Sequence, residues 1–251
     1  MIEKDLYQRW QEALELTKAQ QKSGGIGTLS EKPLHAAIKY TIEPNDSYHE
    51  VRIGSSVADV ITSEGIWEVQ TRNLHSMKKK LEFFLTQGKV TVIHPIAQKK
   101  TIYWVDEDSG EVSKPSVSPK KGKPLDSFME LMYVRDYLLH PNFRLQLWML
   151  EVEEYRFLNG YGESRKKRAT RYQQIPVELN EIVTCSCGED YLSLLPELPP
   201  KFTRKDLKTA AKRSDSWTQR CIYTLEQLSL VERVGKEGRS FVYELKPQKI
   251  K

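Results

Sequence analysis

Hydrophobic residues follow a helical period at the start of the chain. Leu6, Trp10 and Leu14 recur every four residues among charged neighbours, which predicts a helix over 3–21. Paired glycines after Ser23 carry a high helix cost and are expected to end it. Residues 1–27 are therefore interpreted as an N-terminal helix followed by a glycine-rich joint.

The next block of the chain shows both the helical period and the two-residue alternation of strands. Its predicted helices and strands are a helix over 30–40 with Ser30 as N-cap, strands over 49–53, 57–62 and 66–71, a helix over 74–86 and a buried strand over 90–96. The apolar face of the second helix consists of Leu74, Met77, Leu81, Phe84 and Leu85. A strand that follows a helix of this length indicates a parallel crossover.

The pattern continues to a proline-rich stretch over 194–200, which we interpret as a domain linker. Before it, the sequence predicts a further strand over 101–105, a helix over 126–140 and a strand over 143–153. Basic loops are expected at 118–123 and at 165–171. The predicted main domain thus spans 28–195, and a smaller one spans 196–251.

The smaller domain has its own pattern. Thr203 is placed to cap one helix, and a second helix over 217–228 buries a stripe of Trp217, Cys221, Leu225 and Leu228. Strands are predicted over 230–234 and 240–245 with a hairpin tip between them. This order of two helices and a basic two-stranded hairpin resembles a winged-helix domain.

That resemblance implies a way of binding DNA. The second helix would enter the major groove by its N-terminal end, and the hairpin tip would meet phosphates. The residues implied are Ser216, Gln219 and Arg220 on the helix, and Lys236 and Arg239 on the hairpin tip. A winged helix that binds protein is the alternative, because a fold alone does not fix function.

Charge separates the two parts of the chain. Residues 199–251 carry 13 Lys and Arg against 6 Asp and Glu, a net charge of +7, whereas the whole chain has +5. A localised positive field favours a polyanion, and nucleic acid is the most common one. A solvated basic surface would give the same count.

Composition excludes several classes. Apolar residues make up 39% and charged residues 29% of the chain, which argues against full disorder. No apolar run reaches the roughly 20 residues that span a bilayer, and the N-terminus lacks the pattern of a signal peptide. Three cysteines, with no zinc-ribbon spacing, indicate a reducing cytoplasm.

The chemistry of the larger domain is carried by acidic residues on neighbouring strands. Asp59 and Glu68 lie on strands joined by a tight glycine turn, and Gln70 shares the strand face of Glu68. Carboxylates among apolar neighbours need a counter-charge, which a divalent cation such as Mg²⁺ or Mn²⁺ supplies. Alternatively, the two carboxylates face water or pair with Arg52 and Arg72.

Asp59 followed by Glu68-Val69-Gln70, within this order of helices and strands, resembles the PD-(D/E)xK nuclease superfamily. The resemblance implies a restriction-endonuclease-like α/β (α+β) fold, with a mixed sheet flanked by helices. It implies that Asp59, Glu68 and the Val69 carbonyl hold metal, that Glu31 on the first helix joins the catalytic set, and that Glu50 is a further acidic member.

The motif departs from the superfamily at Gln70, where a lysine is expected. Glutamine can orient water only by hydrogen bonding and brings no positive charge. Some superfamily members with glutamine here are active, and others without the lysine are inactive binding modules. Lys78, Lys79 and Lys80 on the crossover helix can contact phosphate, although such a run is more often a solvated face.

Together these features predict a Mg²⁺-dependent DNA endonuclease that acts on double-stranded DNA, with Gln70 orienting the attacking water. Lys120 and Lys121 in the first basic loop suit a phosphate backbone. A non-catalytic DNA-binding regulator with an inactive nuclease fold, RNA as the substrate, and assembly as a homodimer remain alternatives. This two-part layout also resembles that of uncharacterised bacterial proteins.

Overall fold

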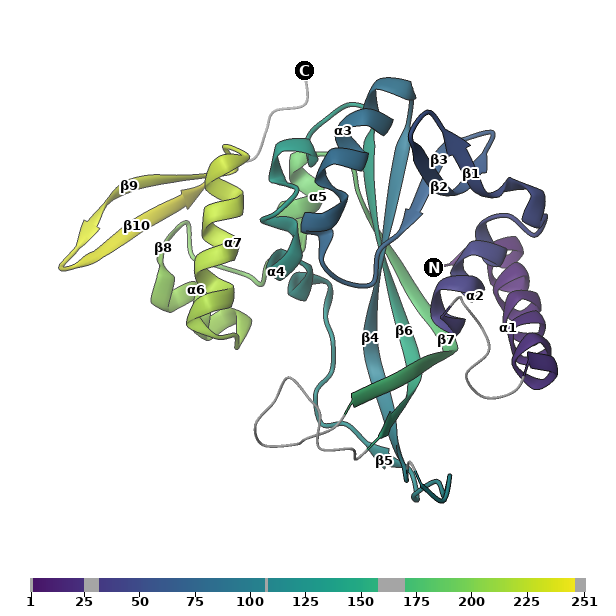
Figure 1. The fold of residues 1–251 in the computed structure, drawn as a ribbon. Coiled ribbons are helices and arrows are strands. Elements are labelled where there is room, and N and C mark those ends of the chain that lie inside the picture. The colour runs from purple at the N-terminus through teal and green to yellow at the C-terminus, as the bar shows by residue number, and fades with distance from the viewer. Residues whose placement is uncertain (1, 25–31, 107, 158–169, 247–251) are drawn as a thin grey trace. The chain divides into compact units, whose positions relative to one another are not determined.

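The computed structural model describes residues 2–24, 32–106, 108–157 and 170–246. This part of the chain is a mixed α+β fold with a large mixed sheet flanked by helices and a separate small sheet (Figure 1). The large sheet has the strand order β1-β2-β3-β4-β6-β7, with β5 paired to β4, and the small sheet has the order β8-β10-β9. The predicted α/β (α+β) class is confirmed.

The α-helices are α1 Lys4–Gly24, α2 Pro33–Ile42, α3 Lys78–Gln87, α4 Phe128–Leu131, α5 Gly188–Ser193, α6 Arg204–Ala211 and α7 Asp215–Gln227. The 3₁₀ helices are η1 Asp46–Tyr48, η2 Leu74–Met77, η3 Pro124–Ser127 and η4 Arg135–Tyr137. The strands are β1 His49–Ile53, β2 Ser56–Thr62, β3 Gly65–Val69, β4 Val90–Val105, β5 Ser116–Val117, β6 Phe143–Phe157, β7 Thr170–Cys185, β8 Lys201–Thr203, β9 Val231–Glu237 and β10 Ser240–Leu245.

The helices and strands belong to two compact units. The first unit comprises residues 1–62, 95–123 and 148–182, and the second comprises residues 63–94, 124–147 and 183–251. Strands β4, β6 and β7 therefore contribute residues to both units.

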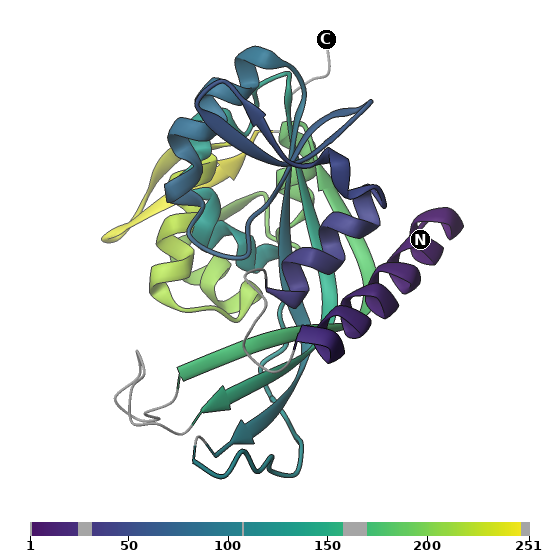
Figure 2. The ribbon, with the colours of Figure 1, turned by 45° about the vertical axis from the view of Figure 1, so that its right-hand side comes forward.

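The first unit contains α1 and α2, which lie side by side (Figure 2). Trp10 of α1 is fully buried and meets Trp148 of β6 edge-to-face, with ring centroids 6.0 Å apart. The N-terminal helix is thus part of this unit's core. Helix α2 has Pro33 in its first turn, and its N-cap is Lys32 rather than the predicted Ser30, which lies outside the described residues.

Strands β1 and β2 of the same unit match the strands predicted over 49–53 and 57–62, and they pair antiparallel. Their register pairs His49 with Val60 and Val51 with Ala58, so Glu50 lies opposite Asp59. Glu50 adopts φ 51°, a left-handed conformation that is uncommon for a residue other than glycine. Such strained backbone is held in place by the surrounding structure and is enriched at functional sites.

Strand β4 corrects the prediction of two separate strands over 90–96 and 101–105. It is a single strand of 16 residues that continues through the polar stretch between them. Within the first unit, Thr101 pairs with Val117 of β5, and the N–H groups of Ser118 and Gly122 donate to the carbonyls of Lys100 and Ala97. These bonds extend the ladder where the apolar pattern stops.

A buried carboxylate anchors the first unit farther along β6. Glu154 has no exposed surface and accepts hydrogen bonds from Lys100 Nζ at 2.9 Å, Gln174 Nε2 at 2.7 Å and Arg156. Burial raises the pKa of this carboxyl, but the hydrogen bonds and charges of Lys100 and Arg156 outweigh burial and hold the pKa below its ordinary value of 4.5.

This depressed pKa predicts an acid-dependent stability. A carboxyl whose folded pKa lies below its unfolded pKa stabilises the fold fully above the unfolded value, and the stabilisation is lost as the pH falls through the folded pKa. Urea unfolding of the wild type and Glu154→Gln, between about pH 3 and pH 7, is expected to give a free-energy difference that is constant above pH 5 and shrinks in acid. An equal difference at both ends of the range would contradict this origin.

The second unit contains the predicted crossover. Strand β3 pairs in parallel with β4, in a register that joins Ile66 to Val90 and Glu68 to Val92, and η2 and α3 connect the two strands. The predicted apolar face of this helix is buried throughout. Gly65 begins β3 with φ 128°, and a Cβ there would collide with the Lys89 carbonyl, so only glycine fits this position.

The predicted helix over 126–140 is wrong in its form. This segment is broken into η3, α4 and η4, with i to i+3 hydrogen bonds such as Tyr133 N–H to the Glu130 carbonyl. Its buried side chains Phe128, Leu131 and Val134 recur every three residues. That spacing matches the three residues per turn of a 3₁₀ helix, which brings all three onto one face.

The C-terminal part of the second unit follows its pattern closely. Thr203 caps α6 as predicted and forms a capping box with Asp206, and Ser214 caps α7. The predicted stripe of α7 is buried. Strand β8 was not predicted, and it pairs with β10 through Phe202 and Tyr243, whose rings stack with centroids 5.9 Å apart.

Candidate functional site

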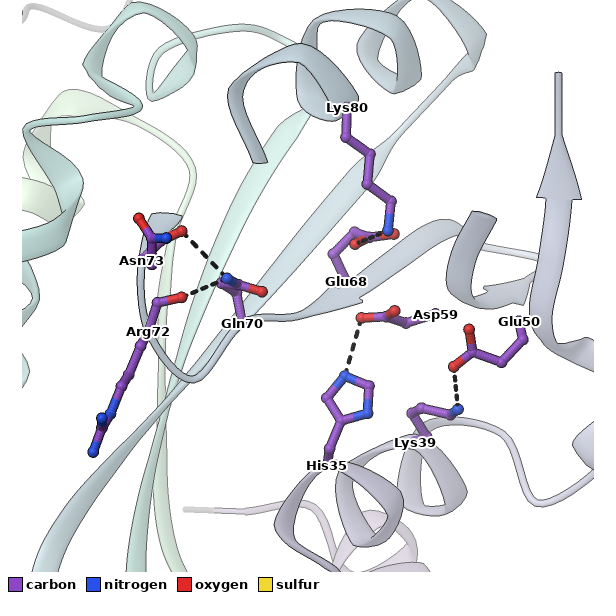
Figure 3. A network of polar contacts seen from close by, with 9 residues as sticks. All are labelled: His35, Lys39, Glu50, Asp59, Glu68, Gln70, Arg72, Asn73 and Lys80. Carbon is purple, nitrogen blue, oxygen red and sulfur yellow. Dashed lines mark hydrogen bonds and ion pairs between the residues drawn. The ribbon is translucent and has the colours of Figure 1, made fainter. Parts of the chain in front are cut away.

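In the second unit, Glu68 lies near the end of β3 and is almost completely buried. Its Oε2 lies 2.7 Å from Nζ of Lys80, whereas the Glu68 side chain is only 4% exposed and that of Lys80 is 27% exposed (Figure 3). Lys80 lies in the first turn of α3, and Nζ also lies 5.5 Å from the ring centroid of Phe84. The counter-charge that a buried carboxylate needs therefore comes, at least in part, from this lysine.

Gln70 follows β3 directly and stabilises the loop before η2. Its Nε2 donates to the carbonyls of Arg72 and of Asn73, the latter at 3.3 Å (Figure 3). Asn73 has φ 56°, so these bonds hold a left-handed turn in place. The nitrogen of the amide is thus engaged within the chain, and the amide oxygen is the atom suited to accept a hydrogen bond from water.

His94 on β4 is a core histidine with a hydrogen-bond partner. It is buried, and its Nδ1–H donates to the Gln70 carbonyl at 2.7 Å. Burial disfavours the imidazolium form and lowers the pKa of His94. This neutral histidine fixes the backbone at Gln70.

In the first unit, two acidic side chains of the hairpin meet one face of α2. His35 and Lys39 are one helical turn apart, and each contacts a different carboxylate. Nε2 of His35 lies 3.3 Å from Oδ2 of Asp59, and Nζ of Lys39 lies 2.7 Å from Oε1 of Glu50 (Figure 3). The Asp59 side chain is 16% exposed and that of Glu50 is 58% exposed.

The predicted metal ligands are thus distributed over both units. Asp59 and Glu50 belong to the first, and Glu68 and the Val69 carbonyl belong to the second, so their joint use of one cation stays a prediction. Among the described residues, no group of three or more His, Cys, Asp or Glu side chains is arranged to hold a metal ion. The donor types still fit Mg²⁺, which takes one or two carboxylates plus water and phosphate oxygens.

Two further predictions concern basic loops and the first helix. Glu31 and residues 165–169 of the predicted loop at 165–171 lie outside the described residues, and residues 170–171 belong to β7 rather than to a loop. Lys120 and Lys121 are exposed in the loop that follows β5 in the first unit, and their charges face solvent as a phosphate contact requires.

The residues implied in DNA binding differ in their surroundings within the second unit. Ser216 and Gln219 are exposed on α7, and Arg239 is exposed beside Gly238 at the hairpin tip. Lys236 lies over the ring of Phe241 at 5.1 Å. In contrast, Nη1 of Arg220 donates to the Met129 carbonyl at 2.9 Å and to Tyr133 Oη at 3.3 Å, so this arginine also holds α4 against α7.

The sequence did not identify the basic partners of the three carboxylates, which are His35, Lys39 and Lys80. His35 and Lys39 carried a signal, because two basic residues four apart on a helix share one face. Lys80 was one of three consecutive lysines, and its pairing with Glu68 depends on the turn of η2 before α3. Five residues that line one hollow of the second unit also went unnoticed, because positions so far apart in the sequence share no regular spacing. They are Arg135, Arg204, Tyr223, Arg233 and Phe241.

The fold and these clusters define a mixed α+β protein with acidic residues on adjoining strands and a basic C-terminal helix–hairpin module. The chain belongs to the family described as "Domain of unknown function (DUF8091)", whose model matches residues 32–186. It is similar to an "Uncharacterized protein" of Treponema pallidum (strain Nichols), with 28% identity over 228 residues that cover 88% of each chain. No solved structure matches the chain.

The described residues contain no helix that is both long and apolar enough to cross a membrane.

Proposed function

We propose that this protein is a metal-dependent endonuclease of the PD-(D/E)xK type that hydrolyses phosphodiester bonds in double-stranded DNA with Mg²⁺ or Mn²⁺. The observation that supports this best is the placement of Glu68, a nearly buried carboxylate at the end of β3, against a lysine of the crossover helix. A restriction-endonuclease-like fold is proposed for the parts built around β3, α3 and β4.

The chain offers each role that such hydrolysis needs. Asp59, Glu68 and the Val69 carbonyl would hold the metal, which supplies Lewis-acid stabilisation of charge on the phosphate and an activated water. Lys80 brings the positive charge that Gln70 lacks, and it lies on the helix directly after the motif. Gln70 keeps its amide oxygen for the attacking water, because its nitrogen is bound to the loop.

His35 and Lys39 would act as positioning residues for the acidic cluster of the first unit. His35 contacts Asp59, and an orienting partner of this kind fixes the direction in which a metal-binding carboxylate points. Lys39 holds Glu50 in the same way, beside the strained backbone at Glu50. Glu31 remains in the proposed catalytic set on the resemblance alone.

DNA would be bound by a winged-helix-like module over residues 196–251. The capped helices α6 and α7, the hairpin of β9 and β10 and the additional strand β8 support this part of the proposal. Net charge in this region favours a nucleic acid over a neutral partner. We place the activity in the cytoplasm, where the free thiols of Cys185, Cys187 and Cys221 stay reduced.

The proposal is tested by plasmid cleavage. Supercoiled plasmid and a single-stranded RNA are incubated with the full chain and Mg²⁺ or Mn²⁺, and compared with Asp59→Ala, Glu68→Ala and an exposed control, Glu64→Ala. We expect nicking by the wild type and the control, and a loss of about a thousandfold in both site variants, because each removes several kcal/mol of charge stabilisation. Activity that survives both substitutions would reject the site.

A non-catalytic DNA-binding regulator is the second candidate. It is favoured by the absence of lysine at position 70 and by the use of the Gln70 amide nitrogen within the chain. Duplex binding without cleavage of DNA or RNA, under both metals, would select this function. Cleavage of RNA alone would retain the hydrolytic site and change the substrate.

A further inference from the structure

A hollow of about 670 Å³ lies within the second unit, where α7 faces the hairpin of β9 and β10. Its volume falls within the roughly 300–1,000 Å³ typical of small-molecule sites. The side chains that matter for the argument are Arg135, Arg204, Arg220, Tyr223, Arg233 and Phe241.

Positive charge dominates its lining. Four arginines line it, and the acidic residue among the lining residues is Glu226. Glu226 forms a bidentate pair with Arg233, at 2.6 and 3.1 Å, and so offsets one of the four charges. Arg135 lies 3.8 Å from Asp136 and donates to the Met132 carbonyl at 2.9 Å, and Arg204 donates to the Asp215 carbonyl at 3.5 Å. The hollow therefore has an excess of positive charge that suits an anion.

Two exposed aromatic rings accompany the arginines. Tyr223 is 38% exposed and Phe241 is 39% exposed, which is a large fraction for such side chains. The Arg135 guanidinium lies 5.2 Å from the Tyr223 ring centroid, and that of Arg233 lies 4.5 Å from the Phe241 centroid. Guanidinium planes and aromatic faces together form a surface on which a flat ring can stack.

The neighbouring segment limits what the hollow can accept. The Nε1–H of Trp217 donates to the Leu125 carbonyl, Arg213 forms a bidentate pair with Asp126, and Arg220 binds the Met129 carbonyl. The segment from η3 to α4 thus covers one side of α7 near its N-terminus. A helix that reads a major groove must project into it, so a single base fits this hollow better than a duplex edge.

We propose that this hollow binds an unpaired nucleotide, with the base stacked against Tyr223 or Phe241 and the phosphate held by Arg204 and Arg135. Gln219 and Ser216, which also line the hollow, offer polar groups to the edge of the base. The inference rests on the proposed nucleic-acid binding of this module and does not depend on cleavage. The nucleotide can belong to a single strand or be free.

The test measures binding in EDTA, where metal-dependent cleavage does not occur. Fluorescence anisotropy follows a labelled 12-nucleotide single strand and the matching blunt duplex, with the full chain and with Tyr223→Leu, Phe241→Leu and Arg204→Gln. Matched controls are Tyr223→Phe and Phe241→Tyr, which keep a flat ring, and Lys205→Gln, which removes one charge from the exposed neighbour of Arg204. Thermal unfolding verifies that each variant is folded.

We expect single-strand affinity to fall roughly 5- to 100-fold in the two leucine variants, as the loss of one stacked base predicts. The single-strand affinity of the ring-keeping controls and of Lys205→Gln should stay within about twofold of the wild type. Duplex affinity should change little in the leucine variants and in these controls. Deoxyadenosine monophosphate that competes with the strand would identify a free nucleotide as a sufficient ligand. Competition by unlabelled strand alone would identify the strand as the source.

Equal single-strand affinity in the leucine variants and the ring-keeping controls would overturn the proposal, as would an equal loss on the duplex. This outcome is separate from failure of the endonuclease proposal. A chain that cleaves plasmid but binds single strands independently of Tyr223 and Phe241 would refute only the nucleotide site. A chain that binds them through these rings without cleaving would refute only the endonuclease.

Discussion

Lys80→Met is expected to lower the free energy of unfolding by about 2–3 kcal/mol at neutral pH in the presence of a chelator. Glu68 Oε2 lies 2.7 Å from Lys80 Nζ, and the carboxylate is buried while the lysine is about a quarter exposed. Methionine keeps the length and apolar stem of lysine but removes the charge. The partial exposure of Lys80 places the expected loss just below the roughly 3–5 kcal/mol that removal of one partner from a fully buried ion pair costs.

Two controls separate the ion pair from the helix. Lys79→Met removes an exposed charge from the same turn of α3 and should change stability by less than about 0.5 kcal/mol. Lys80→Met combined with Glu68→Met removes both charges and should regain most of the loss, because an apolar pair of similar size carries no desolvation penalty. Urea unfolding followed by circular dichroism measures all three.

The effect of a divalent cation on stability tests whether Glu68, besides pairing with Lys80, is a metal ligand. If Glu68 is a metal ligand, Mg²⁺ or Mn²⁺ should stabilise Lys80→Met more than it stabilises the Lys80→Met/Glu68→Met protein, because a ligand that binds only the folded state adds to its stability. Equal metal effects on the two variants would contradict the ligand role of Glu68. The ion-pair result would still stand.

Local patterning predicted the parts of this fold in which neighbouring residues decide the structure. Strands β1 and β2, the buried face of α3 and the parallel pairing of β3 with β4 follow from alternation, from helical spacing and from crossover length. The cap of α6 follows from a hydroxyl and a carboxylate three residues apart, and the cap of α7 is the hydroxyl of Ser214.

Elements whose form depends on distant partners escaped prediction. Strand β8 has only three residues and is stabilised by pairing with β10, about 40 positions later in the chain. The segment over 126–140 has apolar residues at spacings of three and four, which suit an α-helix and a 3₁₀ helix almost equally. Contacts of Leu125 and Met129 with α7 favour the tighter winding.

The candidate site also combines residues that a local motif identifies with residues that only the folded chain brings to them. A motif identifies Glu68 and Gln70 because spacing along one strand is local, whereas the partners Lys80, His35 and Lys39 depend on where helices return to the strands. The buried Glu68 carboxylate does have a counter-charge, but local patterning did not identify Lys80 as its source. A lysine of the crossover helix supplies positive charge where the sequence predicted a metal ion or, alternatively, pairing with Arg52 and Arg72.

Trp217→Ala is expected to cost about 3–5 kcal/mol of unfolding free energy, a typical loss when a large buried ring becomes a methyl group. Trp217 is 2% exposed and meets Phe128 edge-to-face with centroids 6.2 Å apart. Its Nε1–H also donates to the Leu125 carbonyl at 2.9 Å. The ring thus links α7 to the segment from η3 to α4 by packing and by one directional bond.

The Trp217→Phe variant separates the contribution of ring packing from that of the hydrogen bond to the Leu125 carbonyl. It keeps most of the apolar ring and loses the hydrogen bond, so it should cost about 1–2 kcal/mol, the usual penalty when a buried carbonyl loses its donor. Far-UV circular dichroism in urea measures both variants without relying on tryptophan fluorescence. Equal losses in the two variants would assign the whole effect to the bond with Leu125. A larger loss in alanine shows that ring packing holds this segment against α7, and with it the wall of the arginine-lined hollow.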